Sequence, residues 1–407
     1  MVVLLAFGAG IANAKIFGTK PLVISAATDG SSANGDSGQP VISGDNRVSK
    51  YIAFYSDASN IAAGDGNGVR DVFVWTRPRG RSGQTLNRVG VGGALTIASV
   101  ASNGAQANGP SERPNLDGSM KSSPKCVAFQ SQATNLNASD ATPDWDIYVR
   151  NLRTKKTYLA SAGVSGDATR PSLNGKCTEV VYEAGGSVYR AKSKGWALGA
   201  GAKKRSSRVA AGSQIRISLE GTSIGWVAPN GAVKWKTAGR RARTVGRGTT
   251  PWVSDKDRKA GWGITFQSGN TVLSRKITRK LKLATRARIT GAVFGGSTVY
   301  VPNRGIINYA KGKSFYYFNA NTGNSDDLAH ANTDITEMGI GARGTMMVFA
   351  AGGGDQDFID TAPFQGPPFI DPNSPPTIAP IVRVPPPVRY NSIYVKVLPT
   401  KGCGSGC

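Results

Sequence analysis

The chain of 407 residues is poor in the side chains that most enzymes use for catalysis or for holding metals. It contains a single histidine, His330, and four cysteines with no Cys-x-x-Cys spacing. A serine–histidine–aspartate triad needs a histidine base, and structural zinc sites need clustered cysteines and histidines. The composition therefore argues against a triad hydrolase and against a zinc site.

Acidic residues are also scarce. The sequence has 50 Lys and Arg but only 25 Asp and Glu, which gives a formal net charge of +25. Most of the excess lies between Arg190 and Thr290, where 24 basic residues face only Glu220, Asp255 and Asp257, a net of +21. A field of one sign on this scale favours anionic partners and speeds their capture.

The densest basic clusters of this span are the candidate polyanion-binding residues. They are Lys203, Lys204, Arg205, Arg240, Arg241, Arg243, Arg275 and Lys276. The same span contains five tryptophans, namely Trp196, Trp226, Trp235, Trp252 and Trp262. Basic grooves with aromatic platforms suit nucleic acid or acidic polysaccharide, and the alternative is that the indoles pack in the interior. The expected partner is an anionic polymer of the cell envelope, nucleic acid, or an acidic protein.

Long apolar runs are absent beyond the N-terminus. Residues 2–12 are apolar and precede Ala12-Asn13-Ala14, the A-x-A pattern of a signal-peptidase site. We therefore predict a signal peptide over residues 1–14 and an exported protein, periplasmic or extracellular; the alternative is a buried first strand. No segment is long and apolar enough to predict a membrane span.

A repeat runs along the chain. Residues 51–77 (YIAFYSDASNIAAGDGNGVRDVFVWTR) align with residues 126–152 (CVAFQSQATNLNASDATPDWDIYVRNL), each with a short apolar strand, a polar loop and an alternating strand. Fainter copies bring the number to seven, at a period of roughly 40–50 residues, and each contributes four short strands, as in β-propellers. Ten prolines between residues 361 and 390 predict an extended insertion in the last copy.

We therefore predict an all-β fold, a single β-propeller over residues 15–400 with seven four-stranded blades. Six blades is the alternative. The N-terminal strand within residues 20–30 is expected to complete the last blade and close the ring, which removes two sheet edges. Residues 401–407 form a tail rich in cysteine and glycine.

The stretch GDSGQP, from Gly35 to Pro40, resembles the nucleophile loop of chymotrypsin-like proteases. In the repeat it falls just before the first strand of a blade, where Pro40 matches Pro114 and Pro171. Its glycines, aspartate and serine are turn formers. We interpret Ser37 as a turn residue and not as a nucleophile.

The four cysteines form an even set, typical of an oxidising compartment, and allow three pairings. We favour Cys126–Cys177 and Cys403–Cys407, because each pair lies in related or adjacent sequence. The first pair would link consecutive blades.

The first two copies resemble the TolB-like, WD-repeat-like propeller family, whose units read approximately as VAF.S.ATNL followed by D.NG..DVFVRD. The match is carried by residues 52–54 with Asn60, Asp65 and 71–74, and in the second copy by residues 127–129 and 146–150. The resemblance implies an exported propeller without implying one activity.

The loop GDGNGVRD presents Asp65, Asn67 and Asp71 at alternating positions, where oxygen ligands could bind calcium. Asn-Gly is also a strong turn signal, so turn and strand-cap roles are the alternative. No other cofactor is expected.

These observations favour a non-enzymatic binding or scaffold module at the cell envelope. The alternative is a polysaccharide-active enzyme of the lyase type that uses the central channel of the propeller.

Overall fold

The computed structural model describes residues 22–397, except 46–48, 78–92, 120, 197, 199–205, 257–260, 295, 299–305, 320–322, 332–334, 336, 341–345 and 353–389. The predicted signal peptide, the proline-rich insertion and the cysteine tail with Cys403 and Cys407 lie outside the described residues. Only one helical turn, η2 (Ser193–Gly195), occurs in the described part, and no helix there is long and apolar enough to cross a bilayer.

Five regular blades each contain four antiparallel strands in chain order. Blade 1 contains β2 (Ser37–Ile42), β3 (Tyr51–Ser56), β4 (Asp71–Thr76) and β5 (Ala94–Ile97). Blade 2 contains β6 (Ser111–Leu116), β7 (Cys126–Ser131), β8 (Asp146–Asn151) and β9 (Lys156–Leu159). Blade 3 contains β10 (Ala168–Leu173), β11 (Glu179–Ala184), β12 (Ser187–Lys192) and β13 (Ser206–Ala211). Blade 4 contains β14 (Ser213–Ile217), β15 (Ser223–Val227), β16 (Ala232–Thr237) and β17 (Arg243–Arg247). Blade 5 contains β18 (Thr249–Val253), β19 (Trp262–Ser268), β20 (Thr271–Ile277) and β21 (Leu283–Thr290).

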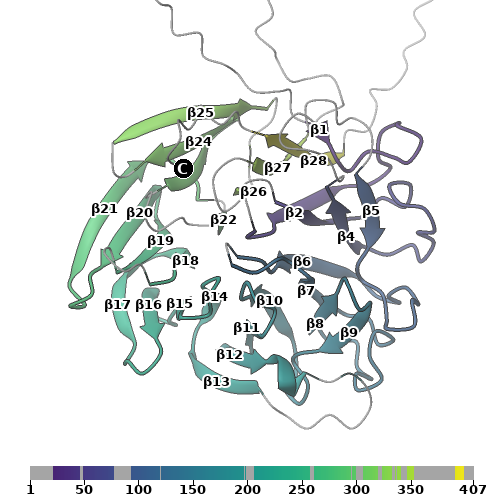
Figure 1. Ribbon diagram of the computed structural model, residues 1–407, viewed down its shortest axis with the longest axis horizontal. Coiled ribbons are helices and arrows are strands. Elements are labelled where there is room, and N and C mark those ends of the chain that lie inside the picture. The colour runs from purple at the N-terminus through teal and green to yellow at the C-terminus, as the bar shows by residue number, and fades with distance from the viewer. Residues whose placement is uncertain are drawn as a thin grey trace, which may run out of the picture.

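The blades stand around a common centre (Figure 1). The first strand of each blade, β2, β6, β10, β14 or β18, lies toward the centre, and the fourth, β5, β9, β13, β17 or β21, lies on the outer rim. This arrangement confirms the prediction of a single all-β propeller with four-stranded blades.

Two less regular sheets complete the ring. One contains β23 (Ile306–Lys311), β24 (Ser314–Asn319) and β25 (Asn324–His330), and the closing sheet contains β1 (Leu22–Val23), β28 (Asn391–Val397), β27 (Met346–Gly352), β26 (Glu337–Ile340) and β22 (Gly296–Thr298). The β22–β26 pair is parallel, although hairpin-connected strands are antiparallel. The prediction of seven four-stranded blades is therefore not confirmed. The described strands form five four-stranded sheets, one three-stranded sheet and one five-stranded sheet.

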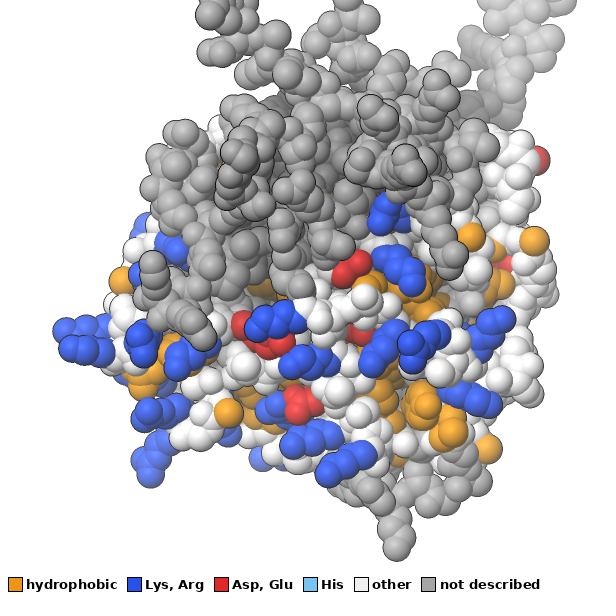
Figure 2. Space-filling view, in the orientation of Figure 1, with side chains coloured by type: hydrophobic (Ala, Val, Ile, Leu, Met, Phe, Trp, Pro, Cys, Tyr) orange, Lys and Arg blue, Asp and Glu red, His pale blue; other side chains and the backbone are white. Residues whose placement is uncertain are grey.

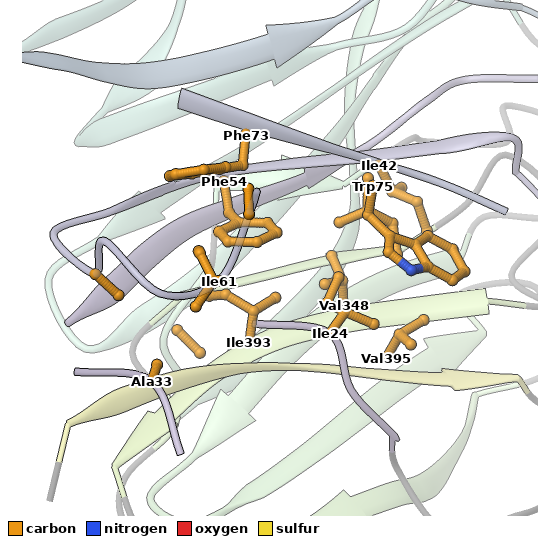
Figure 3. Close-up of a cluster of buried hydrophobic side chains, with 14 of the residues drawn as sticks. Ile24, Ala33, Ile42, Phe54, Ile61, Phe73, Trp75, Val348, Ile393 and Val395 are labelled. Carbon is orange, nitrogen blue, oxygen red and sulfur yellow. The ribbon is translucent and has the colours of Figure 1, made fainter. Parts of the chain in front are cut away.

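The N-terminal strand closes the ring as predicted. Leu22 and Val23 pair antiparallel with Val395 and Tyr394 of β28, so the two ends of the described chain share one sheet. A hydrophobic cluster fills the seam between this sheet and blade 1, where Phe54 and Phe73 stack at 5.9 Å between ring centroids (Figure 3). This cluster brings together residues more than 300 positions apart in the sequence. Removing their apolar surface from water stabilises the contact between the closing sheet and blade 1.

The GDSGQP stretch is part of blade 1 and not a nucleophile loop. Ser37 is the first residue of β2, is buried, and donates a hydrogen bond from its hydroxyl to the hydroxyl of Ser56 at 2.8 Å. Ser111 and Ser131 repeat the contact in blade 2 at the same distance. The interpretation of Ser37 as a turn residue is therefore wrong, because the strand β2 begins at this residue and the turn ends before it.

Candidate functional site

The predicted polyanion-binding residues that the structure describes lie in the outer halves of blades 4 and 5, on the third strand, the fourth strand or the turn between them. Arg240 and Arg241 occupy the turn between β16 and β17, and Arg243 begins β17; all three are exposed. Arg275 and Lys276 lie on β20 and are half-buried. Lys203, Lys204 and Arg205 lie outside the described residues. In the view of Figure 2, Lys and Arg side chains far outnumber Asp and Glu side chains on the visible described surface.

Further exposed cations lie beside these. The turn after β20 and the outer strand β21 carry exposed basic side chains, namely Arg279, Lys280, Lys282 and Arg288. Together with Arg240, Arg241 and Arg243 they form what we call the outer basic surface. Their signal was present in the sequence as runs of Lys and Arg, but a run does not say whether its members are exposed together.

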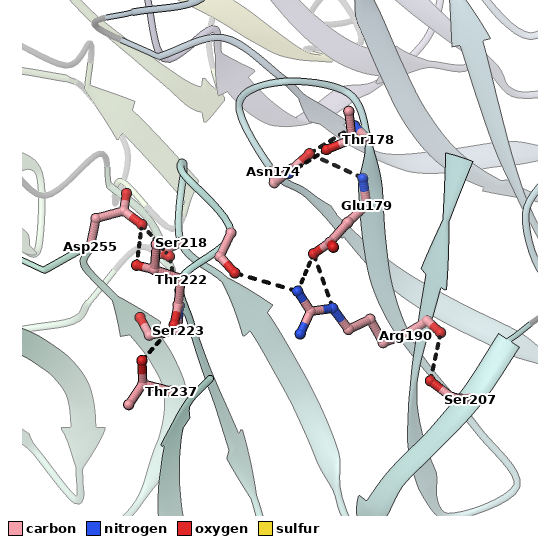
Figure 4. Close-up of polar contacts among 11 residues, drawn as sticks. Asn174, Thr178, Glu179, Arg190, Ser207, Ser218, Thr222, Ser223, Thr237 and Asp255 are labelled. Atoms are coloured by element: carbon pink, nitrogen blue, oxygen red, sulfur yellow. Dashed lines mark hydrogen bonds and ion pairs between the residues drawn. The ribbon is translucent and has the colours of Figure 1, made fainter. Parts of the chain in front are cut away.

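The two acids of the same span that the structure describes, Glu220 and Asp255, are occupied by structural contacts. Asp255 accepts hydrogen bonds from the hydroxyls of Ser218 at 2.5 Å and Thr222 at 2.8 Å and from the backbone N–H of Glu220 at 2.8 Å (Figure 4). The carboxylate of Glu220 pairs with Lys176 at 3.1 Å. In the described part of the chain, no carboxylate pairs with any cation of the outer basic surface.

The tryptophans of the basic span mostly pack in the interior. Trp226, Trp235 and Trp262 are 3, 0 and 8 % exposed, so their faces are not available as platforms for a polymer. Trp235 of blade 4 meets Trp262 of blade 5 edge-on, at 5.2 Å between ring centroids. These indoles hold neighbouring blades together, which is the alternative that the sequence had left open.

The calcium candidate loop has the contacts of a strand cap. Asn67 donates hydrogen bonds through its side-chain nitrogen to the Asp71 carboxylate at 2.7 Å and to the carbonyl of Ala107 at 3.0 Å. The Ser99 hydroxyl also donates to Asp71, whose pKa is raised to about 6 chiefly by burial. Burial likewise raises the pKa of Asp65. Asn67 thus turns a donor, and not a ligand oxygen, toward Asp71; calcium binding here stays a prediction.

The inner strands share a backbone feature that the sequence did not reveal. One residue near the start of each inner strand in blades 1–5, the third in blades 1–3 and the second in blades 4 and 5, has a positive φ between 48° and 55° without being glycine. This left-handed backbone conformation is strained for residues with a side chain. It directs one backbone N–H away from the hydrogen bonds between the strands of its own sheet and toward the preceding blade. The residues in question are Gln39, Arg113, Arg170, Gln214 and Thr250.

Each of these N–H groups donates to a side-chain oxygen of the preceding blade or closing sheet. The described bonds run from Gln39 to Glu337, from Arg113 to Gln39, from Arg170 to Gln130, from Gln214 to Glu183, from Thr250 to Gln214, and in a sixth case from Phe294 to Gln267. Because an unpaired buried N–H is costly, these bonds offset the backbone strain and link the blades in sequence around the channel. We call them the inter-blade ring.

The acceptors of the inter-blade ring come from two different strands. In blades 1 and 4 the left-handed residue, Gln39 or Gln214, supplies the acceptor itself. In blades 2, 3 and 5 that residue is an arginine or a threonine, and the acceptor is supplied by the second strand, from Gln130, Glu183 and Gln267. The register places all three opposite the residue before the left-handed one. Where the first strand of a blade lacks an acceptor, the second strand of the same blade provides it.

The predicted disulfide is present. Cys126, the first residue of β7 in blade 2, is bonded to Cys177, in the turn before β11 of blade 3. The buried carboxylate of Asp117 accepts the backbone N–H of Cys126 at 2.9 Å, and burial raises the pKa of Asp117 to about 7. The bond therefore joins consecutive blades, as the spacing had indicated. The second predicted pair, Cys403–Cys407, lies outside the described residues.

Comparison with known proteins does not assign the chain to a family. No family model matches the chain, and no curated protein matches it in sequence. Among solved structures, it is similar to the β-propeller domain of Cps50 (Swd1) from Myceliophteria thermophila, with 9% sequence identity and a TM-score of 0.48 over 78% of this chain and 93% of that chain. The fold assignment therefore rests on the strand order itself, and membership of the TolB-like family stays a prediction.

Proposed function

We propose that this protein is a non-enzymatic binding module of the cell envelope that holds an anionic polymer on the outer basic surface of blades 4 and 5. The observation that carries the proposal is the separation of charges in this sector. Its described acids are held in structural hydrogen bonds and one ion pair, while exposed cations on the outer strands have no carboxylate partner among the described residues.

Neutralisation of phosphate, sulfate or carboxylate groups by these cations would release counterions, so the binding depends steeply on salt. The buried tryptophans exclude stacking on their faces as a source of affinity. The proposed partner is therefore recognised by charge density and not by aromatic stacking. We further propose that the protein is exported, which the A-x-A pattern at residues 12–14 and the Cys126–Cys177 bond both favour.

The test compares two variants that each lose three exposed charges from the turn between the third and fourth strands of a blade. The first replaces Arg240, Arg241 and Arg243 with Gln in blade 4. The second replaces Arg153, Lys155 and Lys156 with Gln in blade 2. Both variants have the same net charge, so any difference between them reports the position of the charge and not its amount.

We expect the wild-type protein to bind heparin and double-stranded DNA columns at low salt and the blade 4 variant to elute at clearly lower salt. With DNA, the slope of log K against log salt should fall by up to about 2.7 if all three residues contact phosphates. The blade 2 variant should elute close to wild type. Equal losses of retention in the two variants would show that only the net charge matters and would contradict the proposal. The proposal would also be refuted if the wild-type protein were not retained at low salt.

A further inference from the structure

A buried carboxyl group lies beside the disulfide that joins blades 2 and 3. Asp117 follows the inner strand β6, and one of its carboxylate oxygens lies within 4.8 Å of the sulfurs of both Cys126 and Cys177. All three residues are buried. The surroundings of the two cysteines are apolar, since both belong to a hydrophobic cluster that also contains Ile147 and Val180. The carboxyl group and the bond therefore share a space from which water is largely excluded.

Only one oxygen of this carboxyl group has a partner among the described residues. Oδ1 accepts the backbone N–H groups of Lys125 at 2.8 Å and Cys126 at 2.9 Å. Oδ2 of Asp117 is buried and has no hydrogen-bond partner in the described part of the chain. An unpaired buried oxygen is most costly when it is charged, and burial raises the pKa of this group to about 7. Below that pH the group holds a proton next to the disulfide.

Few charges act on Asp117 from the loops packed against it. After burial, the two backbone N–H groups and the charge of Lys125 lower its pKa, and the charge of Asp45 in blade 1 raises it. Neither charge outweighs burial. The other charged residues of these loops are Lys121, which is exposed, and Lys176, which pairs with Glu220 at 3.1 Å.

The two sulfurs differ in how easily a reductant can reach them. Cys126 begins the second strand of blade 2 and is 0 % exposed. Cys177 is 8 % exposed and lies in a turn between the exposed residues Lys176 and Thr178. Its backbone has a φ of 53°, a strained conformation for a residue with a side chain. A thiolate that comes from outside therefore meets the sulfur of Cys177, and Cys126 becomes the leaving group.

The turn that carries Cys177 is held by hydrogen bonds that do not depend on the disulfide. The side-chain oxygen of Asn174 accepts the backbone N–H groups of the two residues after Cys177, at 2.9 and 3.1 Å (Figure 4). Gly118 of blade 2 donates its N–H to the carbonyl of Gly175 in this turn at 3.1 Å. We therefore expect the two cysteines to stay close after reduction, so that the bond can form again.

We propose that Cys126–Cys177 is a redox-active disulfide and that Asp117 is the proton donor for its reduction by an external dithiol. One thiolate of the dithiol attacks the sulfur of Cys177, the S–S bond breaks, and its electron pair goes to the sulfur of Cys126. The carboxylic acid of Asp117 gives its proton to this sulfur and becomes a carboxylate. The second thiolate of the dithiol then attacks the mixed disulfide. This step releases the cyclic, oxidised dithiol and the thiolate of Cys177, which takes a proton from water.

The reaction passes two electrons from the dithiol to the two cysteines and removes the covalent link between blades 2 and 3. In the opposite direction, the carboxylate of Asp117 accepts the proton of the Cys126 thiol while the bond forms. The site is separate from the outer basic surface of blades 4 and 5. It therefore goes beyond the proposed function and does not depend on polymer binding.

The experiment measures the rate at which dithiothreitol reduces this bond in the folded protein at pH 5.5, 7 and 8.5. Thiols are alkylated and counted by mass spectrometry, in a chain with Cys403→Ser and Cys407→Ser so that only one bond contributes. Oxidised glutathione is reduced under the same conditions, and the ratio of the two rates cancels the pH dependence of the reductant. We expect this ratio to be at least about tenfold larger at pH 5.5 than at pH 8.5, because a general acid acts only while it is protonated.

Asp117→Asn keeps an oxygen for the two backbone N–H groups and loses the proton. In the same background, it should lower the rate by about tenfold at pH 5.5 and change it little at pH 8.5. The control is Asp146→Asn. Asp146 is a buried acid of the same blade with a pKa raised to about 7, but it pairs with Ser131 at the other end of β7. This change should alter the rate by the same factor at all three pH values.

Three results would overturn the proposal. In the first, the bond resists dithiothreitol until the protein unfolds, or the rate does not depend on the concentration of dithiothreitol, so that unfolding limits the reaction. In the second, Asp117→Asn and Asp146→Asn change the rate alike at each pH. In the third, the ratio to oxidised glutathione is the same at pH 5.5 and 8.5, a result that needs no variant of Asp117 to fold.

Discussion

Blades 1 and 2 differ from blades 4 and 5 in the residue that begins the third strand, although the strand order is the same. In blades 1 and 2 the third strand begins with a buried aspartate, Asp71 or Asp146, that accepts a hydrogen bond from the hydroxyl of Ser99 or Ser161. In blades 4 and 5 that position is Ala232 or Thr271. Two buried tryptophans, Trp235 and Trp262, meet between blades 4 and 5.

The difference shows that a blade of this propeller does not need a buried aspartate–serine hydrogen bond at the start of its third strand. Because indole packing holds blades 4 and 5 together, few acids are needed in their interior. The acids that are present, such as Asp255, accept hydrogen bonds from turn residues. The outer strands of these blades can then carry cations without nearby carboxylates. The sector with few described acids is therefore also the one that carries the outer basic surface.

The largest expected effect comes from the disulfide between blades 2 and 3. Replacing both Cys126 and Cys177 with alanine opens a loop of 51 residues, and the chain-entropy model gives a loss of about 4 kcal/mol in the free energy of unfolding. Urea denaturation of oxidised wild type and the double variant measures this loss. An unchanged midpoint with an unchanged slope would show that the bond does not constrain the unfolded chain.

The second effect is a pH dependence located in blades 1 and 2. Burial raises the pKa of Asp71 to about 6 and that of Asp146 to about 7, from 3.8. The folded state therefore binds protons that the unfolded chain has released, so the free energy of unfolding falls as pH rises from about 4 to about 7. Within this window each group contributes at most about 1.4 kcal/mol per pH unit.

The matching experiment changes both aspartates to asparagine and follows urea denaturation at pH 4, 5.5 and 7. The double variant should show a shallower fall in stability over this range. Some slope should remain because Asp117, with a pKa of about 7, is still present. A double variant whose slope equals that of wild type would locate the pH dependence elsewhere and remove this distinction between the two regions.

The smallest effect tests what the two regions share. Gln39 in blade 1 and Gln214 in blade 4 accept backbone N–H groups of Arg113 and Thr250 in the inter-blade ring. Replacing either glutamine with methionine removes the acceptor and keeps the size, and we expect a loss of about 1–3 kcal/mol in both cases. The control is Gln106→Met, because Gln106 bonds an exposed loop at Gly66.

Equal losses for Gln39→Met and Gln214→Met, both larger than that of the control, would show that the ring supports the two regions alike. A loss confined to Gln39→Met would mean that tryptophan packing has replaced the ring in blade 4.

Much of the fold is visible in the sequence because it depends on local patterns. Alternating apolar residues before and after the polar loops of residues 51–77 and 126–152 predict the strands that the structure contains. Proline at 40, 114 and 171 indicates the inner strands, and the two cysteines align well enough to predict their bond. Where the pattern weakens, after about residue 290, the described sheets are also irregular, and the prediction of seven regular blades fails there.

The sequence by itself determined the strands, the propeller class, the closure by the N-terminal strand and the sector of positive charge. Only the tertiary structure decided which cations are exposed without an acid and that the tryptophans lie inside. It also decided that the acceptors of the inter-blade ring come from two different strands. The reason is physical: strand periodicity is a property of neighbouring residues, whereas these contacts join residues of separate blades, from 27 to 298 positions apart, whose meeting depends on how the ring closes.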